Sequence, residues 1–439
     1  MSVAAVQELS PVEQKLRALA PDPNLPEWFS AMRLQARDAY FSSAYPDRSS
    51  EAWHYGEAKR FKLDGLDIAH AQPGFNGKQY ERICGLTGLP RRVSCLSMLG
   101  PRVTELSQND ALLKAGVTVM ALRQALALRS EQLRPYWLSG LVCPDCDPII
   151  AGHYALVDNG FFVHVPKGVQ APEPVHLIME SGEPGSVVAP HVLVVLEEQA
   201  AADVYVHFIG GSDAERSLQL GLVETHLGDG ARLSLTKIQH LGLRTDAFTR
   251  EAVRIGQDGR YSSISVHFGG YRVRHELDAE LTAQGGEADL YAMHFLRGRQ
   301  CYDFHTHQNH QAPDTRSNLL FKGAVTDRAR ASYQGLITVA PHAQKTDAYQ
   351  ANRTLLLSPE ARSDSSPQLE IQANDVRCTH GSTTTNVGPA ELFYLESRGL
   401  PRETARRLIV SGFMAQVADH IPLPNVRDYA YNYVMERLE

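Results

Sequence analysis

The sequence predicts a mainly β protein with helical regions at both ends, and three observations support this. Short runs rich in Val, Ile, Leu, Tyr and Phe fill residues 161–371, separated by turn signals built on Gly and Asp. Helix-period spacing is missing from that block. On either side of it, apolar residues recur at intervals of three and four. We therefore expect an N-terminal helical region over 1–140, a β core over 141–388 and a C-terminal helical region over 389–439.

Helix signals dominate the first region. Ser10-Pro11-Val12-Glu13 has the form of a capping box, with a proline suited to the first helical position. A second helix is expected where four apolar residues share one face: Phe29, Met32, Ala36 and Tyr40. A further helix is expected from about Val117 to Leu133.

The β block carries a loose internal period. Asp229-Gly230, Asp258-Gly259 and Gly285-Gly286 are turn signals spaced about 28 residues apart, which suits the stacked rungs of a solenoid. A sandwich of regular hairpins would give a similar pattern. The periodicity alone therefore leaves solenoid and sandwich open.

The helical period returns at the C-terminal end. Gly399 is a good stop for a helix over Glu391–Ser397, and Pro401-Arg402-Glu403 opens the next one. That next helix has four apolar residues able to share a face: Ala405, Leu408, Ile409 and Phe413. A last helix is expected over Asn425–Glu439.

Composition excludes two classes of partner. The chain of 439 residues is 43% hydrophobic and 21% charged, with a formal net charge of −7. It has no long run of like charges, which argues against nucleic-acid binding. It also has no basic start followed by an apolar segment and no long apolar stretch, so no membrane association is expected. We expect the protein in the cytoplasm, or in the plastid stroma if it is organellar.

Cys143-Pro144-Asp145-Cys146 is the only close pair among six cysteines. This spacing suits half a zinc site or a dithiol redox pair. The other cysteines do not supply a second pair for zinc, and a redox pair is expected where a helix starts, whereas this motif follows one. We therefore favour a turn with two incidental thiols, and expect all six cysteines to be reduced.

Asp303-Phe304-His305-Thr306-His307-Gln308-Asn309-His310 is rich in imidazoles. On a strand, His305 and His307 point to one face and could bind a metal, whereas His310 points to the other. A free-standing metalloprotein is thus one hypothesis. The alternative is a polar, half-exposed strand or a surface that faces another subunit.

The stretch Asn374–Thr383 places Cys378 and His380 two residues apart, on one face if the chain is extended there. Thiolate and imidazole suit iron in sulfide-bearing clusters, and also zinc and copper. The alternative is a buried cysteine beside a histidine that bonds a loop carbonyl. Spacing alone favours that alternative.

Five motifs follow one another in a fixed order: Ala343–Gln350, Arg353–Ser358, Pro367–Ile371, Asp375–Gly381 and Phe393–Gly399. Together they resemble the SufB/SufD family of iron–sulfur cluster assembly proteins. Asp375-Val376-Arg377-Cys378-Thr379-His380-Gly381 resembles the SufD branch, whereas SufB proteins read Glu-His-Glu-Ala-Thr there. Weaker matches extend over most of the chain: Glu51–Tyr55, Phe162–Gly168, His310, Ser317 and Lys322-Gly323. Cys143 and Cys146 have no counterpart in the family pattern.

The resemblance implies a right-handed parallel β-helix between the two helical regions. It also implies a non-catalytic subunit that pairs with SufB and docks the SufC ATPase through its C-terminal helices, with a homodimer possible in isolation. This agrees with the absence of a G-x-x-x-x-G-K-[ST] phosphate loop.

By the same resemblance, His380, with Cys378, would hold a nascent iron–sulfur cluster or iron transiently at the SufB interface, and the isolated chain would carry no cofactor. Asp375, His305 and His310 become interface candidates. The competing interpretation is a structural brace, in which His380 only bridges the interface.

Overall fold

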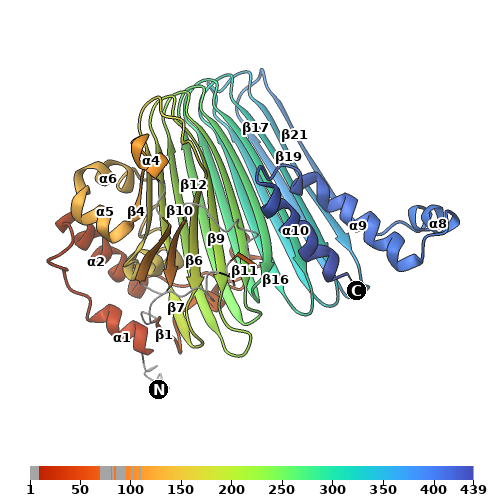
Figure 1. The fold of residues 1–439 in the computed structure, drawn as a ribbon, viewed down its shortest axis with the longest axis horizontal. Coiled ribbons are helices and arrows are strands. Elements are labelled where there is room, and N and C mark those ends of the chain that lie inside the picture. The colour runs from red at the N-terminus through yellow and green to blue at the C-terminus, as the bar shows by residue number, and fades with distance from the viewer. Residues whose placement is uncertain are drawn as a thin grey trace.

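The computed structural model describes residues 9–69, 81, 84–85, 95–99, 102–107 and 110–438. Within these residues the β core forms an 11-stranded and a 10-stranded sheet that face each other (Figure 1). Strand order in the first is β20-β18-β16-β14-β12-β10-β8-β5-β4, with β1 and β7 beside it. The second runs β21-β19-β17-β15-β13-β11-β9-β6-β2-β3.

The strands of the first sheet are β1 (Asp67–Ile68), β4 (Thr118–Ala121), β5 (Gly160–Val165), β7 (Ser186–Val188), β8 (His191–Leu196), β10 (Ser217–Leu227), β12 (Thr245–Ile255), β14 (Arg272–Leu281), β16 (Cys301–His310), β18 (Arg330–Val339) and β20 (Arg362–Ile371). Those of the second are β2 (Cys95–Leu99), β3 (Arg102–Ser107), β6 (Val175–Ser181), β9 (Ala201–Gly210), β11 (Arg232–Leu241), β13 (Arg260–Gly269), β15 (Glu287–Leu296), β17 (Arg316–Val325), β19 (Asp347–Leu356) and β21 (Arg377–Asn386).

The pairing identifies a β-solenoid and excludes the sandwich. From β9 onward the chain alternates between the two sheets, and each strand pairs in parallel with the strand two places along. Arg232 on β11 lies beside Arg260 on β13, which lies beside Glu287 on β15. Regular hairpins would instead pair neighbouring strands antiparallel. The parallel β-helix implied by the family resemblance is therefore confirmed.

The turns explain the period seen in the sequence. Gly230, Asp258 and Gly285 lie at equivalent corners and take left-handed φ values of 66°, 52° and 74°. Glycine adopts this conformation without a Cβ clash, and aspartate tolerates it. The corners also stack, since the Gly230 N–H donates to the Gln257 carbonyl and the Asp258 N–H to the Gln284 carbonyl.

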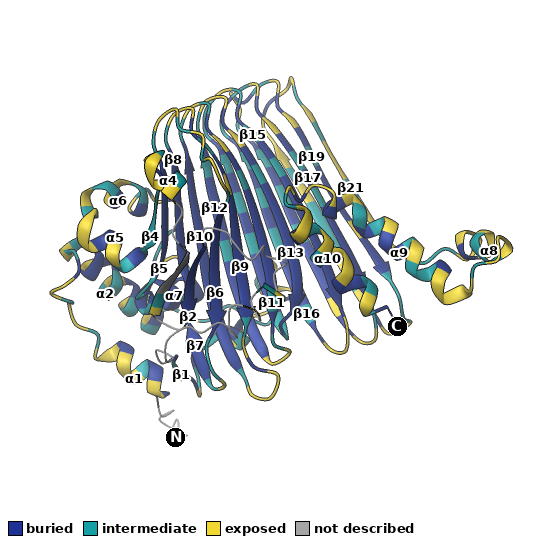
Figure 2. Cartoon of the chain, in the orientation of Figure 1, coloured by how far each residue is buried: buried dark blue, intermediate teal, exposed yellow. Residues whose placement is uncertain are grey.

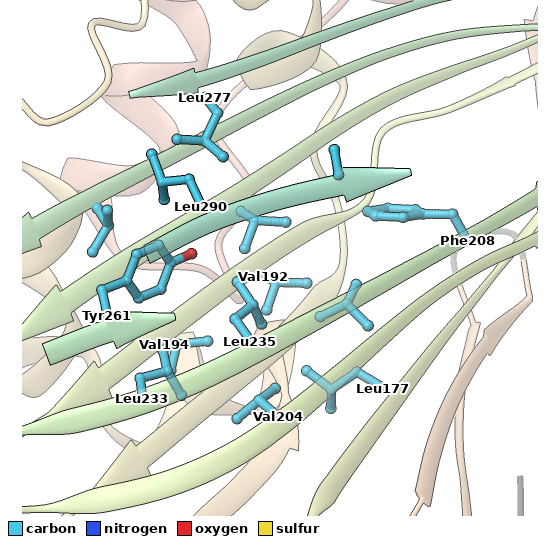
Figure 3. Packing of buried hydrophobic residues seen from close by; sticks show 14 of the residues in the cluster. Leu177, Val192, Val194, Val204, Phe208, Leu233, Leu235, Tyr261, Leu277 and Leu290 are labelled. Carbon is cyan, nitrogen blue, oxygen red and sulfur yellow. The ribbon is translucent and has the colours of Figure 1, made fainter. Parts of the chain in front are cut away.

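Alternate side chains of each strand fill the interior between the two sheets. Figure 3 shows this packing for residues such as Leu233, Leu235 and Tyr261, which meet Val192 and Val194 from the facing sheet. These five side chains are at most 2% exposed. Burial of these apolar side chains along the whole solenoid supplies the main driving force for folding.

The N-terminal helices are α1 (Pro11–Arg17), α2 (Glu27–Ser42), α4 (Asp110–Lys114), α5 (Leu122–Leu128), α6 (Ser130–Trp137) and α7 (Pro148–Leu156), with short 3-10 turns at Glu51–Trp53 and Ala58–Phe61. Except for the short α4, these helices pack on the outer face of the first sheet, whereas Leu112 of α4 joins the interior cluster between the sheets. The capping box is present at Ser10 and Glu13. The predicted apolar face of α2 is buried. α7 is buried almost throughout and packs between α2 and β10.

The expectations for this region are only partly confirmed. The predicted helix from Val117 to Leu133 is strand β4 followed by α5 and α6, because Thr118–Ala121 pairs antiparallel with β5. Helix α7 was missed, although Asp147 and Pro148 are good N-cap and first-turn residues. Strands β2 and β3 also lie in a region expected to be helical.

The C-terminal helices α8 (Pro389–Ser397), α9 (Arg402–Ala418) and α10 (Pro424–Glu436) follow the last strand. α9 and α10 cover part of the outer face of the second sheet. The face predicted for α9 is partly wrong, because Leu408 is 47% exposed whereas Val410 and Met414 are buried. α8 extends away from the solenoid and is largely exposed (Figure 2). Among the described residues, no helix is long and apolar enough to span a membrane.

Candidate functional site

The solenoid ends in a rung whose outer edges are open. β20 and β21, which we call the terminal rung, are the last strands of their sheets in the described chain. Each pairs on one side only, β20 with β18 and β21 with β19. Most of their residues are exposed or half-buried, whereas the preceding strands are mainly buried. A strand edge of ten residues therefore remains free to pair on β21.

The two open edges differ. Pro367 lies in the middle of β20, and proline has no N–H to donate to a neighbouring strand. β21 contains neither proline nor lysine, the residues that commonly block edge pairing. β21 is therefore the better template for another strand.

Cys378 and His380 project from β21 into the mouth of the solenoid. Their partners in the register are Ala348 and Gln350 on β19, whose side chains are buried in the interior. The prediction that the thiol and the imidazole share a face is confirmed, since the chain is a regular strand here. Both donors thus lie on the inner face of the terminal rung.

The two side chains differ in environment. Cys378 is half-buried against a small apolar cluster that includes Ile337 and Ala373. Burial raises the pKa of the Cys378 thiol, and the charge of Asp347 adds to this. His380 is exposed, and its imidazole has no hydrogen-bond or ion-pair partner in the part of the chain that the structure describes. A ligand or partner arriving at the open end would meet the imidazole first.

Comparison with protein families identifies this architecture. Residues 177–413 match the model described as SUF system FeS cluster assembly, SufBD core domain. Residues 22–177 match the SufBD protein N-terminal region. The chain belongs to the SufBD family. The core match contains β21 and most of α9.

Relatives of this SufBD chain include the iron-sulfur cluster assembly protein SufD of Bacillus subtilis, 25% identical over 98% of this chain and 99% of the relative. An iron-sulfur cluster assembly SufBD family protein of Synechocystis is 31% identical over 90% of this chain and 88% of the relative. A chloroplastic protein of Arabidopsis thaliana, ABCI7, is 29% identical over 62% of this chain and 59% of the relative. Similar proteins thus occur in bacteria and chloroplasts.

Asp375 and His310, two of the other predicted interface residues, lie in different environments. Asp375 is exposed in the link between β20 and β21, beside the terminal rung. His310 is fully buried, and its ring nitrogens lie 2.8 Å from the hydroxyls of Thr315 and Ser317. His310 and Ser317 therefore contact each other in the interior.

His305 and His307 share the outer face of β16, as predicted, but do not form a joint metal site. His305 Nε2 lies 2.8 Å from Arg274 Nη1 and 3.2 Å from Asp303 Oδ1. His307 Nε2 lies 3.0 Å from Thr338 Oγ1. The only cluster of three donor groups close enough for a metal, among the described residues, is Cys143, Asp145 and Cys146.

Sequence reasoning missed the polar side chains behind His380. The buried Tyr333 hydroxyl donates to Gln350 Oε1 at 3.1 Å, and Asn352 donates to Ser365 Oγ at 3.1 Å across the interior. These residues give the solenoid a polar lining just inside its mouth. The alternation of polar residues at 350, 352 and 354 was the available signal, since alternate strand residues face one side.

The expectation of six reduced cysteines is wrong for one pair. Cys143 and Cys146 form a disulfide, because the turn between α6 and α7 brings their Cα atoms to 5.5 Å. The motif also lies directly before a helix, contrary to the argument that set the redox interpretation aside.

Proposed function

We propose that this SufBD chain is a SufD-like subunit of an iron–sulfur cluster assembly complex, pairing with SufB and docking SufC. The observation that carries the proposal is the uncapped terminal rung, which bears Cys378 and His380. In the SufBD family this segment is expected at the subunit interface.

Pairing with SufB is supported by the open edge of β21. Native proteins usually cover or block such edges, because unpaired backbone groups recruit other strands. An edge strand from SufB would satisfy these groups and close the solenoid. The same edge supports a homodimer when SufB is absent, since two copies present identical strands.

A ligand role for His380 and Cys378 is supported by their donor types and by their number. An imidazole and a thiol on one strand face give mixed nitrogen and sulfur ligation, which suits iron and iron–sulfur clusters. Two ligands are too few to hold a cluster alone, so the partner must supply the rest. The cluster is then the cargo of the complex, held transiently, and the isolated chain carries none.

SufC docking is proposed at the C-terminal helices. Phe393 and Tyr394 on α8 are 72% and 57% exposed, and α8 extends away from the solenoid (Figure 1). Exposed aromatic residues on a projecting helix are typical of a protein–protein contact. The chain has no phosphate loop, so ATP hydrolysis belongs to the partner and this subunit is non-catalytic. We place the complex in the cytoplasm or the plastid stroma.

Co-expression with SufB and SufC tests the proposal. The wild-type chain is expected to co-purify with both and to support cluster formation. His380→Ala should leave the complex assembled but lower the cluster yield severalfold. Thr384→Ala is the matched control, because Thr384 lies on the same exposed face of β21.

Two results would count against this account. A His380→Ala complex that forms clusters at the wild-type yield excludes the ligand role. A variant that loses SufB, with normal yield in whatever complex remains, indicates that His380 only braces the interface.

A further inference from the structure

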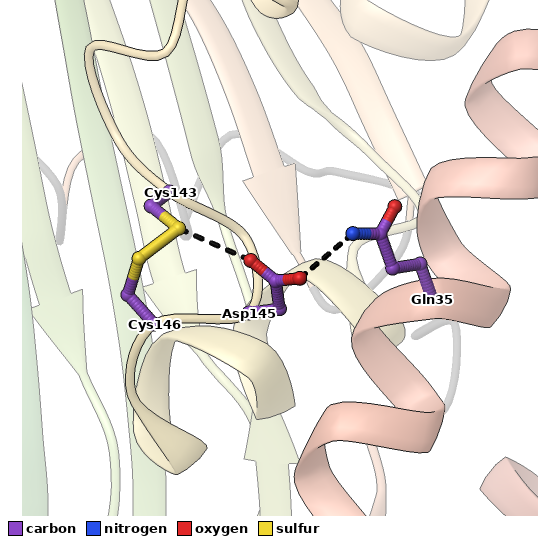
Figure 4. Close-up of a disulfide and its surroundings, with 4 residues drawn as sticks. All are labelled: Gln35, Cys143, Asp145 and Cys146. Atoms are coloured by element: carbon purple, nitrogen blue, oxygen red, sulfur yellow. Dashed lines mark hydrogen bonds between the residues drawn. A yellow bond between two sulfur atoms is a disulfide. The ribbon is translucent and has the colours of Figure 1, made fainter.

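The disulfide between Cys143 and Cys146 is not part of the proposed cluster site or of the proposed partner contacts. It occupies the turn between α6 and α7, with Asp145 between the two cysteines in the chain and Gln35 of α2 nearby (Figure 4). Cys146 is exposed and Cys143 is half-buried. The bond is therefore open to attack from solvent on the Cys146 side.

This bond does little to hold the fold together. It closes a loop of only four residues, and the stabilisation from a cross-link falls as the loop shortens. Cys95, Cys301 and Cys378 are not in disulfides, so the chain does not depend on oxidised cysteines for its framework. Disulfides in cytosolic proteins of mesophiles are usually transient and catalytic or redox-sensing, and exposed disulfides are more easily reduced than buried structural ones.

We propose that Cys143 and Cys146 form a thiol–disulfide exchange site that reacts with a dithiol reductant, either a protein of the thioredoxin class or a small dithiol. The reductant thiolate attacks Cys146 Sγ, the bond between the two sulfurs breaks, and Cys143 leaves as a thiolate that takes a proton from solvent. The second reductant thiol then attacks the mixed disulfide and releases Cys146. Two electrons and two protons pass to the chain, and the reductant becomes a disulfide.

Asp145 is positioned to respond to this reaction. Its Oδ1 lies 3.1 Å from Cys143 Sγ, and its Oδ2 accepts a hydrogen bond of 2.7 Å from Gln35 on α2 (Figure 4). A disulfide sulfur has no proton to donate, so the contact becomes a hydrogen bond only after reduction. The carboxylate then favours the protonated thiol of Cys143. Asp145 is thus a positioning residue for the reduced state.

The disulfide also lies next to the N-terminus of α7, a helix that packs on the first sheet. Asp147, the residue after Cys146, caps α7 by accepting hydrogen bonds from the N–H groups of Ile149 and Ile150. α7 in turn donates from His153 to the Leu220 carbonyl of β10 at 2.8 Å. Reduction therefore acts at the helix that anchors the N-terminal region to the solenoid.

The test equilibrates the full-length chain in graded mixtures of reduced and oxidised dithiothreitol. Acid quenching, alkylation and peptide mass spectrometry then report each cysteine. Cys143 and Cys146 are expected to change together between disulfide and dithiol in one reversible transition. Thioredoxin added in catalytic amounts should speed this change at least tenfold. Cys301, half-buried and not in a disulfide, is the internal control and should show no paired change.

Single variants test the direction of attack. In Cys143→Ser the remaining Cys146 should form a mixed disulfide with an aromatic disulfide reagent at least tenfold faster than Cys143 does in Cys146→Ser. Asp145→Asn should shift the pH profile of Cys143 alkylation in Cys146→Ser to lower pH.

Three results would overturn the proposal. The bond could persist in excess dithiothreitol under native conditions, or both thiols could stay reduced under full oxidation. The third is that the reduced chain binds one equivalent of zinc and that this zinc prevents oxidation of Cys143 and Cys146. None of these bears on His380 or SufB.

Discussion

Cys378 and His380 show how far single residues can be interpreted from sequence. Their common face follows from strand geometry and was predictable. Their position on the last rung was not, because no local pattern indicates that β21 is the last strand of its sheet in the described chain. Without that fact, a buried cysteine beside a histidine was the more reasonable hypothesis. The open end, and not the spacing, makes the two side chains available to a partner.

Gly323 on β17 tests how tightly the interior is packed. A Cβ at this position would lie 1.8 Å from Nε2 of His294, the residue paired with it on β15. His294 is buried and its ring centroid lies 4.9 Å from that of Phe304, so it has little room to move. Gly323→Ala should therefore lower the free energy of unfolding by about 1–3 kcal/mol in chemical denaturation.

Gly412→Ala is the control for that variant. Gly412 lies in α9, and among the described residues no atom outside the adjacent residues and nearby helix backbone lies within 4 Å of the position its Cβ would take. Alanine there should be neutral or stabilise the protein by ~0.5–1 kcal/mol. Equal stabilities for the two variants would show that the interior at Gly323 is looser than described.

At the level of elements, β21 decides how the chain meets a partner. The Arg377 N–H donates to the Thr346 carbonyl, which belongs to the link before β19. Because N–H groups alternate sides along a strand, those of Cys378, His380 and Ser382 point to the open edge. The edge can therefore be altered without breaking the ladder to β19.

Ser382→Pro removes one outward N–H and places a ring on the edge. The internal ladder should survive, because proline is tolerated on edge strands where its nitrogen faces solvent. We expect an unchanged melting temperature within a few degrees and SufB affinity lower by about tenfold or more, since one bond worth ~1 kcal/mol is lost and strand contact is obstructed. Titration calorimetry or biolayer interferometry measures the affinity.

Ser382→Ala keeps the N–H and should bind SufB as the wild type does. Thr383→Pro tests the other side of the strand. The Thr383 N–H faces β19, so losing this donor should destabilise the terminal rung itself. Normal SufB binding by Ser382→Pro would rule out strand pairing through β21.

For the whole molecule, the sequence predicted the order helix, β core, helix, and the family motifs predicted the solenoid. Periodicity could not separate solenoid from sandwich, because both place turns at similar intervals. The Val117–Leu133 error arose because β4 is helix-compatible in isolation and is fixed as a strand only by pairing with β5. Of the candidate site, the residue types were predictable and their shared open end was not.

Buried histidines predict how the stability of the whole fold depends on pH. Burial lowers the pKa of His153, His226 and His310 to about 4, below the ordinary value of 6.5. Between pH 6.5 and about 4, these histidines are mostly protonated in the unfolded chain but mostly neutral in the folded protein. The free energy of unfolding therefore falls as the pH drops from 6.5 toward 4. Each such histidine contributes ~1.4 kcal/mol per pH unit across that window.

His310→Gln isolates one contribution from the carboxylates that titrate in the same range. Glutamine can still bond Thr315 and Ser317, and it does not titrate. Urea denaturation at pH 4.5, 5.5 and 6.5 should give the variant a shallower dependence than the wild type by about 1 kcal/mol per pH unit. If the free energy of unfolding changed with pH equally in the variant and the wild type, His310 would bind a proton as readily in the folded state as in the unfolded state, contrary to this prediction.

The most direct test of the central claim is pulsed electron paramagnetic resonance of the cluster-loaded, reduced complex with SufB and SufC. We expect a nitrogen hyperfine coupling from a directly bound imidazole in the wild type and in Thr384→Ala. It should be absent in His380→Ala. An unchanged nitrogen coupling in His380→Ala, or none in the wild type, would contradict the assignment of His380 as a ligand across the interface.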